Sequence, residues 1–142
     1  VGSPAMSRPS TDLIRGVPFF VGLDDAAADR LASEFVERRY APGEVILGQG
    51  QEGKSFFLVE EGSVAVEFDG DAGGSIPAGG FFGELSLADR EARRSATIRA
   101  ESEVLAWSLP IWVFRPLVEA NPAVAWGLIE YLADRVRQSH AL

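Results

Sequence analysis

The chain has 142 residues, of which 46% are hydrophobic and 24% charged, a composition that suits one soluble globular domain with a single core. It has no cysteine and one histidine, His140, which excludes disulfides, cysteine nucleophiles and a multi-histidine metal site within one chain. Its net charge of −8 argues against a general nucleic-acid-binding surface, because such a surface needs a basic patch.

The N-terminal residues show no targeting pattern. No apolar run in the chain approaches the length of a membrane-spanning helix, and the basic-then-apolar pattern of a signal peptide is missing. We therefore expect a cytoplasmic setting and no membrane contact. The segment Val1–Ala5 before Met6 resembles a tag remnant, so residues 1–10 are predicted to be a tail and residues 11–142 the folded domain.

Short helical segments are predicted at the N-terminal end of the domain. Thr11–Gly16 suits a helical turn, and Pro18–Phe20 suits a tight apolar connector. Asp24 is a good N-cap, because its carboxylate can accept from the first free amides of a helix. We expect that helix to run to about Phe35.

The middle of the chain has the pattern of a β domain. Apolar side chains alternate at Val64, Val66 and Phe68, which is typical of a strand with one buried face. Further apolar strands are predicted at Val45–Leu47 and Phe56–Val59. Glycine-containing turns separate these runs, at Gly48–Gly53, Glu61–Gly62, Asp69–Gly74 and Gly79–Gly80. This spacing predicts a small antiparallel barrel or jelly roll.

The last third of the chain combines two strands with two helices. Ala96–Ala100 and Val104–Leu109 are the predicted strands, and Ile111–Glu119 suits a helix that contains Pro116. Asn121-Pro122 begins the final helix, since proline suits a first helical position. An apolar stripe follows at every fourth residue of that helix, at Val124, Leu128, Leu132 and Val136.

These elements predict an α+β domain: an antiparallel β-roll, or jelly-roll-like barrel, flanked by N-terminal and C-terminal helices. The aromatic side chains are assigned to its interior. Core positions are predicted for Phe19, Phe20, Phe56, Phe57 and Trp107, and packing positions on the C-terminal helices for Trp112 and Trp126.

One motif points to a different fold. Gly48–Ser55 matches the Walker A pattern GxxxxGK[ST] letter for letter, which taken alone predicts an ATPase or GTPase. That loop needs a helix directly after it, because the amides and dipole at the helix N-terminus hold the phosphates. Here the apolar strand Phe56–Val59 follows instead, and the alternating strands and helices of a parallel sheet are missing. We interpret the motif as a glycine-rich turn, and predict no catalytic residue.

The segment from Phe82 to Ala100 carries residues that suit a phosphate ligand. Gly83 precedes a short predicted helix and lets the backbone approach a ligand closely. The amides of Glu84, Leu85 and Ser86 would form an anion seat at the start of that helix. An ionised Glu84 is an acceptor only, so beside a phosphate it needs a donor of its own. A ribose 2′-hydroxyl is such a donor.

A pair of arginines supplies positive charge to the same segment. Arg94, which follows Arg93, offers charge-assisted and bidentate contacts to phosphate oxygens. Ser95 adds a hydroxyl and an amide beside it. Each residue also has an ordinary structural explanation, such as a surface ion pair between Arg94 and Asp89. Their spacing inside a β-roll favours a joint ligand site.

This segment resembles the phosphate-binding cassette of the cyclic nucleotide-binding domain family, in its catabolite-activator and bacterial-channel forms. The strand and turn at Gly62–Val66 and the Asn121-Pro122 start of the last helix are similar as well, so the resemblance runs from about Leu13 to Gln138. It implies a short cassette helix and a ligand site made of Gly83, Glu84, Leu85, Ser86, Arg94 and Ser95. It further implies Val66 as a wall of the base pocket and Arg135 as a residue that reaches the nucleotide from the final helix.

The resemblance implies a cyclic nucleotide sensor without catalysis, metal or cofactor of its own, and favours cAMP over cGMP as the ligand. The hydroxyl of Ser95 keeps cGMP open, since in some family members a hydroxyl there favours cGMP. Binding would draw the C-terminal helix over the pocket and so regulate a fused or partner effector module. The domain itself would contact no nucleic acid. The apolar stripe of the last helix would allow a homodimer, although a lid docked on its own barrel would use the same residues.

Three alternatives stay open at this point. The first is the sensor part of a DNA-binding transcription regulator, whose helix-turn-helix is absent from this sequence. The second is a nucleotide triphosphatase that uses Gly48–Ser55. The third is a domain that keeps the fold and binds nothing or another effector, against which the intact Glu84 and Arg94 count.

Overall fold

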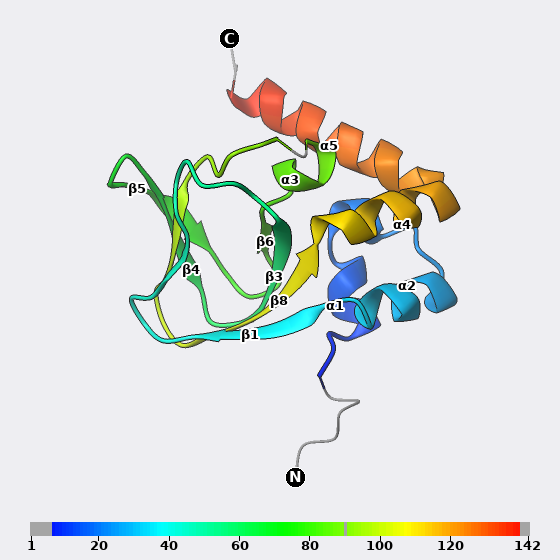
Figure 1. Cartoon of the computed structure of the whole chain (residues 1–142), viewed down its shortest axis with the longest axis horizontal. Helices are drawn as coiled ribbons and strands as arrows, with labels where there is room; N and C mark the ends of the chain where they lie inside the picture. Colours follow the sequence, from blue (N-terminus) through cyan, green and yellow to red (C-terminus); the bar gives the residue numbers. More distant parts are fainter. Residues whose placement is uncertain (1–6, 90, 140–142) are drawn as a thin grey trace.

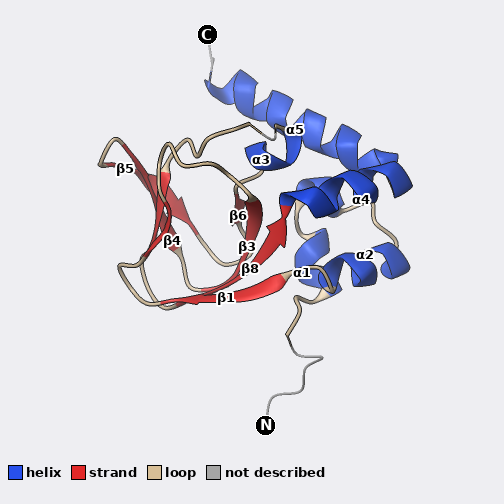
Figure 2. Ribbon diagram, in the orientation of Figure 1, coloured by secondary structure: helices blue, strands red, loops and turns tan. Residues whose placement is uncertain are grey.

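The computed structural model describes residues 7–89 and 91–139. The predicted tag remnant and His140 lie outside the described residues. Within the described part, eight strands form two four-stranded antiparallel sheets, in the orders β1-β8-β3-β6 and β2-β7-β4-β5. The helices gather at one end of this roll, away from the β4–β5 hairpin, and α5 runs above the short helix α3 (Figures 1 and 2). The predicted α+β class and β-roll are confirmed.

The strands are β1 (Val36–Tyr40), β2 (Val45–Leu47), β3 (Ser55–Glu61), β4 (Val64–Phe68), β5 (Asp71–Ile76), β6 (Phe81–Phe82), β7 (Thr97–Ala100) and β8 (Val104–Pro110). The helices are α1 (Thr11–Arg15), α2 (Asp25–Ala32), α3 (Leu85–Ala88), α4 (Phe114–Ala120) and α5 (Pro122–Ser139), with the 3₁₀ turns η2 (Pro18–Phe20) and η3 (Ile111–Val113). Within the described residues, no helix is both long and apolar enough to cross a membrane.

Strand β3 is buried on both faces and separates two apolar clusters. Successive strand side chains point to opposite sides. Phe56 and Leu58 therefore pack with the helices and η2, while Phe57 and Val59 pack inside the roll against the second sheet. The sheet that contains β3 is thus covered on one side by helices and on the other by the second sheet.

The final helix packs closely on the turn η2. A Cβ built on Gly127 of α5 would lie 3.1 Å from Cα of Phe19, so glycine allows this approach. The Phe19 ring then meets Phe81 and Tyr131 edge-on, with centroids 5.4 and 5.7 Å apart. Such edge-to-face contacts each contribute about 0.5–1.5 kcal/mol beyond area burial. These contacts hold α5 across the mouth of the roll.

The N-terminal part differs from prediction in three places. Pro9 is buried and the Ser10 side chain accepts from the α1 backbone, so the packed region begins before Thr11. Helix α2 ends at Ala32 rather than near Phe35, which is nevertheless buried in the core. The strand β1 was not predicted, because its sequence VERRY lacks apolar alternation; it is an edge strand with mostly exposed side chains.

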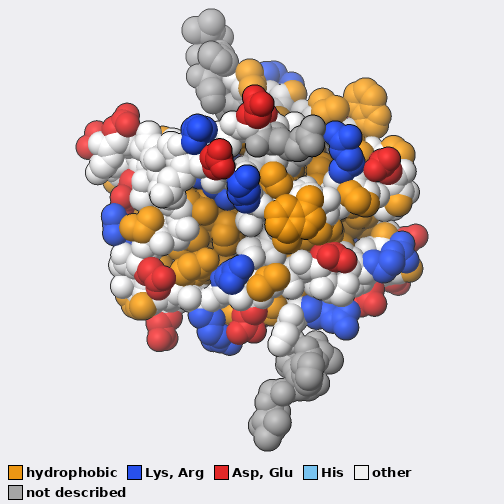
Figure 3. All heavy atoms as spheres, viewed as in Figure 1, with side chains coloured by type: hydrophobic (Ala, Val, Ile, Leu, Met, Phe, Trp, Pro, Cys, Tyr) orange, Lys and Arg blue, Asp and Glu red, His pale blue; other side chains and the backbone are white. Residues whose placement is uncertain are grey.

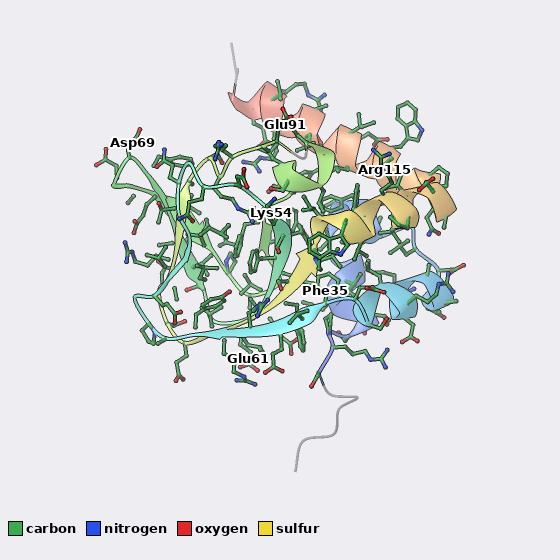
Figure 4. The ribbon with its side chains drawn as sticks, in the orientation of Figure 1. Phe35, Lys54, Glu61, Asp69, Glu91 and Arg115 are labelled. Carbon is green, nitrogen blue, oxygen red and sulfur yellow. The ribbon has the colours of Figure 1, made fainter. Side chains whose placement is uncertain are left out.

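The predicted turn Asp69–Gly74 is also wrong in length. Only Asp69 and Gly70 form the turn, with φ of 52° and 84°, and Asp71–Ile76 continues as β5. Asp-Gly with both φ positive makes the tight hairpin turn whose twist suits antiparallel strands. Figure 4 shows Asp69 at the tip of this hairpin.

The aromatic predictions are confirmed in the core and wrong on the C-terminal helices. Exposure is 6% or less for Phe19, Phe20, Phe56, Phe57 and Trp107. Trp112 and Trp126 are instead 70% and 66% exposed. The apolar stripe of α5 is buried only in its first half, since Val124 is 3% and Val136 58% exposed. A helical period identifies a face, but not how far along the helix that face stays covered.

Candidate functional site

A cavity of about 400 Å³ opens between the β-roll and α5. Its walls come from β4, β5 and β6, from one residue each of β2 and β7, from residues 83–86 and 93–96, and from two side chains of α5. The charged residues that line it are Glu84, Arg93, Arg94 and Arg135. On the face shown in Figure 3, acidic and basic side chains are interspersed, and neither sign gathers into a large patch.

Gly83 forms the turn that joins β6 to α3. Its φ is +85°, a left-handed conformation that suits glycine. A Cβ there would lie 2.7 Å from the Ser55 carbonyl oxygen and 2.8 Å from Nη1 of Arg94, so there is also no space for a side chain. The amide of Ser86 donates to the Gly83 carbonyl at 3.2 Å. It is therefore used inside the turn, and does not belong to the exposed anion seat that the sequence predicted.

Arg94 places a buried cation against the cavity. The residue is only 8% exposed. Its Nη2 donates to the Ser55 carbonyl at 2.9 Å, and its Nη1 donates to Oγ of Ser86 at 3.3 Å. Its Nε is buried and meets no acceptor among the described residues. Burial lowers the pKa of the guanidinium and the nearby Glu84 carboxylate acts in the opposite direction, but an arginine stays charged at neutral pH.

Glu84 is the second buried charge, with 6% of the residue exposed. Nη1 of Arg135 donates to its carboxylate at 2.6 Å. The Tyr131 hydroxyl interacts with both groups: burial and Glu84 raise the pKa of Tyr131, while Arg135 acts to lower it. Tyr131 and Arg135 are four residues apart, so they share one face of α5. The helix is thus fastened to the carboxylate at the start of α3.

All eight residues that the sequence singled out line this one cavity: Val66, Gly83, Glu84, Leu85, Ser86, Arg94, Ser95 and Arg135. Leu85 and Ser95 are exposed, whereas Ser86 is buried. Sequence reasoning missed Tyr131, which lies beside Arg135 in the cavity wall. Its spacing of four residues from Arg135 could have indicated it, because residues at that spacing share one face of a helix.

The Walker-like segment is a loop between β2 and β3, as predicted. The strand β3 begins at Ser55, where a phosphate-binding loop would need a helix. Lys54 lies at the start of this strand in Figure 4, with a side chain that is 69% exposed and an ion pair to Glu52 at 3.5 Å. Nothing in this arrangement gathers amides around a triphosphate.

The substitution Lys54→Ala is therefore expected to have almost no effect. An exposed ion pair contributes about 0–1 kcal/mol, so the melting temperature should change little. Magnesium-dependent ATP turnover, followed by phosphate release, should be at background in the wild-type protein and in the variant. Glu52→Ala, which removes the partner of Lys54, is the matched control. A turnover that is present in the wild type and lost in Lys54→Ala would contradict this interpretation of the loop.

Comparisons with known proteins point to one family. The family model described as the cyclic nucleotide-binding domain matches residues 37–121. An uncharacterised NTE family protein of Mycobacterium tuberculosis is 30% identical over 128 residues, which are 89% of this chain and 22% of that protein. The chain therefore spans about a fifth of that relative.

Two solved structures share the fold and a similar level of sequence identity. The catabolite activator protein of Thermus thermophilus has a TM-score of 0.78 and 31% identity, over 87% of this chain and 60% of that one. The cAMP-bound PfPKA-R has a TM-score of 0.77 and 25% identity, over 93% of this chain and 46% of that one.

Proposed function

Because this chain belongs to the cyclic nucleotide-binding domain family, we propose that it is a regulatory sensor that binds cAMP in preference to cGMP and catalyses no reaction of its own. The preference for cAMP is supported by the likeness to PfPKA-R, whose structure is cAMP-bound.

The observation that carries the proposal is the buried guanidinium of Arg94. A buried polar group without a partner costs roughly 1–3 kcal/mol, and more when it is charged. Nε of Arg94 is such a group within the described residues, and Arg94 lines the cavity. An exocyclic phosphate oxygen would provide the missing acceptor. The amides of Glu84 and Leu85, at the start of α3, would provide further donors to the same phosphate.

The carboxylate of Glu84 would recognise the ribose. It is buried beside the cation, accepts hydrogen bonds only, and takes one from Arg135. Its other lone pairs suit a ribose 2′-hydroxyl. Val66 and Ser95 line the same cavity and would contact the base.

The contact between α5 and the cassette supports a coupling route. Arg135 and Tyr131 reach from α5 to Glu84, the carboxylate that would contact the ligand. A ligand that binds one arrangement of these groups better than another would shift the position of α5. We propose that this shift regulates a fused or partner effector module. The exposed side chains of Trp126, Ile129 and Val136 on α5 would allow a homodimer.

The second candidate is the sensor part of a DNA-binding transcription regulator, which is supported by the likeness to the N-terminal domain of a transcriptional regulator from Streptomyces coelicolor. It predicts that a longer protein containing this domain changes its DNA affinity when cAMP is added.

Thermal unfolding with cAMP, cGMP and ATP–magnesium in separate samples tests the proposal. A ligand at about one hundred times its dissociation constant stabilises the folded state by about 2.7 kcal/mol. For a domain of this size that raises the melting temperature by several degrees. We expect the largest shift with cAMP, a smaller one with cGMP, and none with ATP–magnesium. No shift with either cyclic nucleotide would contradict the proposal, and a shift with ATP–magnesium alone would restore the triphosphatase alternative.

A further inference from the structure

The glycine loop, residues 48–55, holds the backbone of the segment that carries Arg94. The amide of Gly50 donates to the Arg94 carbonyl, and the amide of Arg94 donates to the Gln51 carbonyl, both at 2.8 Å. The amide of Gly53 donates to the Ala92 carbonyl at 3.3 Å. The carbonyl of Ser55 then accepts from the Arg94 guanidinium at 2.9 Å. The loop thus contacts both the backbone and the side-chain end of this arginine.

Gly53 is the point of closest approach in that loop. The residue is buried, and its φ is not among the positive values found for other glycines of the chain. A Cβ built there would lie much closer to Oγ of Ser86 than 3.0 Å, a separation below which real Cβ atoms essentially never approach another heavy atom. It would also lie 3.1 Å from Cζ and 3.2 Å from Nε of Arg94. Glycine is therefore required by space, and not by backbone conformation.

We propose that Gly53 is a positioning residue for Arg94, so that the glycine loop sets the affinity of the cavity for a phosphate. This inference rests on the proposed function. A methyl group at position 53 has two ways to fit. Either Ser86 turns its hydroxyl away, which breaks the bond from Nη1 of Arg94, or the guanidinium itself moves. Both displace a charge-assisted contact that depends steeply on geometry.

The test compares Gly53→Ala with Gly22→Ala. Gly22 is the matched control, because a Cβ there meets nothing within 4 Å and its φ is also outside the positive range. Titrations should use cAMP and its 2′-deoxy analogue, which both carry the phosphate. We expect Gly53→Ala to weaken the binding of both ligands by the same factor of about tenfold, because the displaced guanidinium would lose part of the free energy of a charge-assisted hydrogen bond. Gly22→Ala should bind both like the wild type.

A double-variant cycle shows whether the contact with Ser86 is the route. Ser86→Ala removes the hydroxyl oxygen that the new methyl group would meet. In that background Gly53→Ala should cost less than about threefold, and the difference between the two costs measures the coupling. A tenfold loss that is the same with and without Ser86→Ala excludes the route through Ser86, and if the Nε–H resonance of Arg94 is also unmoved in Gly53→Ala, the loss reflects a general disturbance of the loop and overturns the inference. Wild-type affinity in Gly53→Ala would overturn it as well.

A ligand-free readout separates this inference from the proposed function. The Nε–H resonance of Arg94 in a proton–nitrogen spectrum should move in Gly53→Ala and stay in place in Gly22→Ala. If the wild type binds neither cAMP nor cGMP, the proposed function fails, while this resonance still reports on the positioning of Arg94. An unmoved resonance in Gly53→Ala overturns the inference.

Discussion

Replacing Arg94 with alanine is expected to weaken cAMP binding by about 1.5–3 kcal/mol, which is roughly 10- to 150-fold in the dissociation constant. The guanidinium is buried and lines the cavity, and its Nε lacks an acceptor within the described residues. A phosphate would therefore gain a charge-assisted contact that needs little side-chain reorganisation. Isothermal titration of the two proteins with cAMP measures the difference.

Two further variants make the Arg94 result specific. Arg30→Ala removes an exposed arginine of α2 outside the cavity and should leave the affinity unchanged. Arg94→Lys keeps the charge but loses the planar fork, so its affinity should fall between those of the wild type and the alanine variant. If Arg94→Ala binds cAMP as tightly as the wild type, Arg94 does not contact the phosphate.

The second expected result concerns Glu84. Glu84→Ala should weaken binding of cAMP by roughly tenfold or more, and should weaken binding of 2′-deoxy-cAMP much less. The reason is that only cAMP can donate a 2′-hydroxyl to the buried carboxylate, and hydrogen bonds to charged groups contribute about 1.5–3 kcal/mol. Titration of both proteins with both ligands gives the comparison.

The ion pair with Arg135 needs its own control. Glu84→Ala removes the carboxylate and also the partner of Arg135 in α5. Arg135→Ala breaks the same pair but keeps the carboxylate. It should therefore retain most of the preference for cAMP over the 2′-deoxy analogue. Equal losses of the two ligands in Glu84→Ala would show that this carboxylate does not recognise the ribose.

The sequence was most informative where chemistry and spacing coincide. The residue types around Gly83, Glu84 and Arg94 suit a phosphate and a hydroxyl, and the structure brings them to one cavity. Tyr131 was not predicted as a site residue, because an aromatic residue in an amphipathic helix is normally assigned to the core. Its ring does pack against Phe19 and Phe81, while its hydroxyl interacts with Glu84.

Other features could not be predicted because they depend on contacts between distant segments. β5, with its two glycines, has little β propensity of its own and pairs with β4 through the tight Asp-Gly turn. Hydrophobicity placed Trp112 and Trp126 in the interior, but gave no information on which sides of η3 and α5 face solvent. The role that we infer for Gly53 could not be predicted either, because Gly53 belongs to a motif whose sequence indicates a nucleotide triphosphatase.

Strand β3 has a consequence for how a signal would travel. It has core side chains on both faces and hydrogen-bonded strands on both edges, β8 and β6. Close-packed interiors resist small deformations. β3 therefore acts as a rigid partition between a ligand compartment and a helical compartment. A change that begins at the cavity would therefore reach α5 past the edge of β3, through α3 and the contact of Glu84 with Arg135. In this arrangement β3 stays in place while α3 and α5 move.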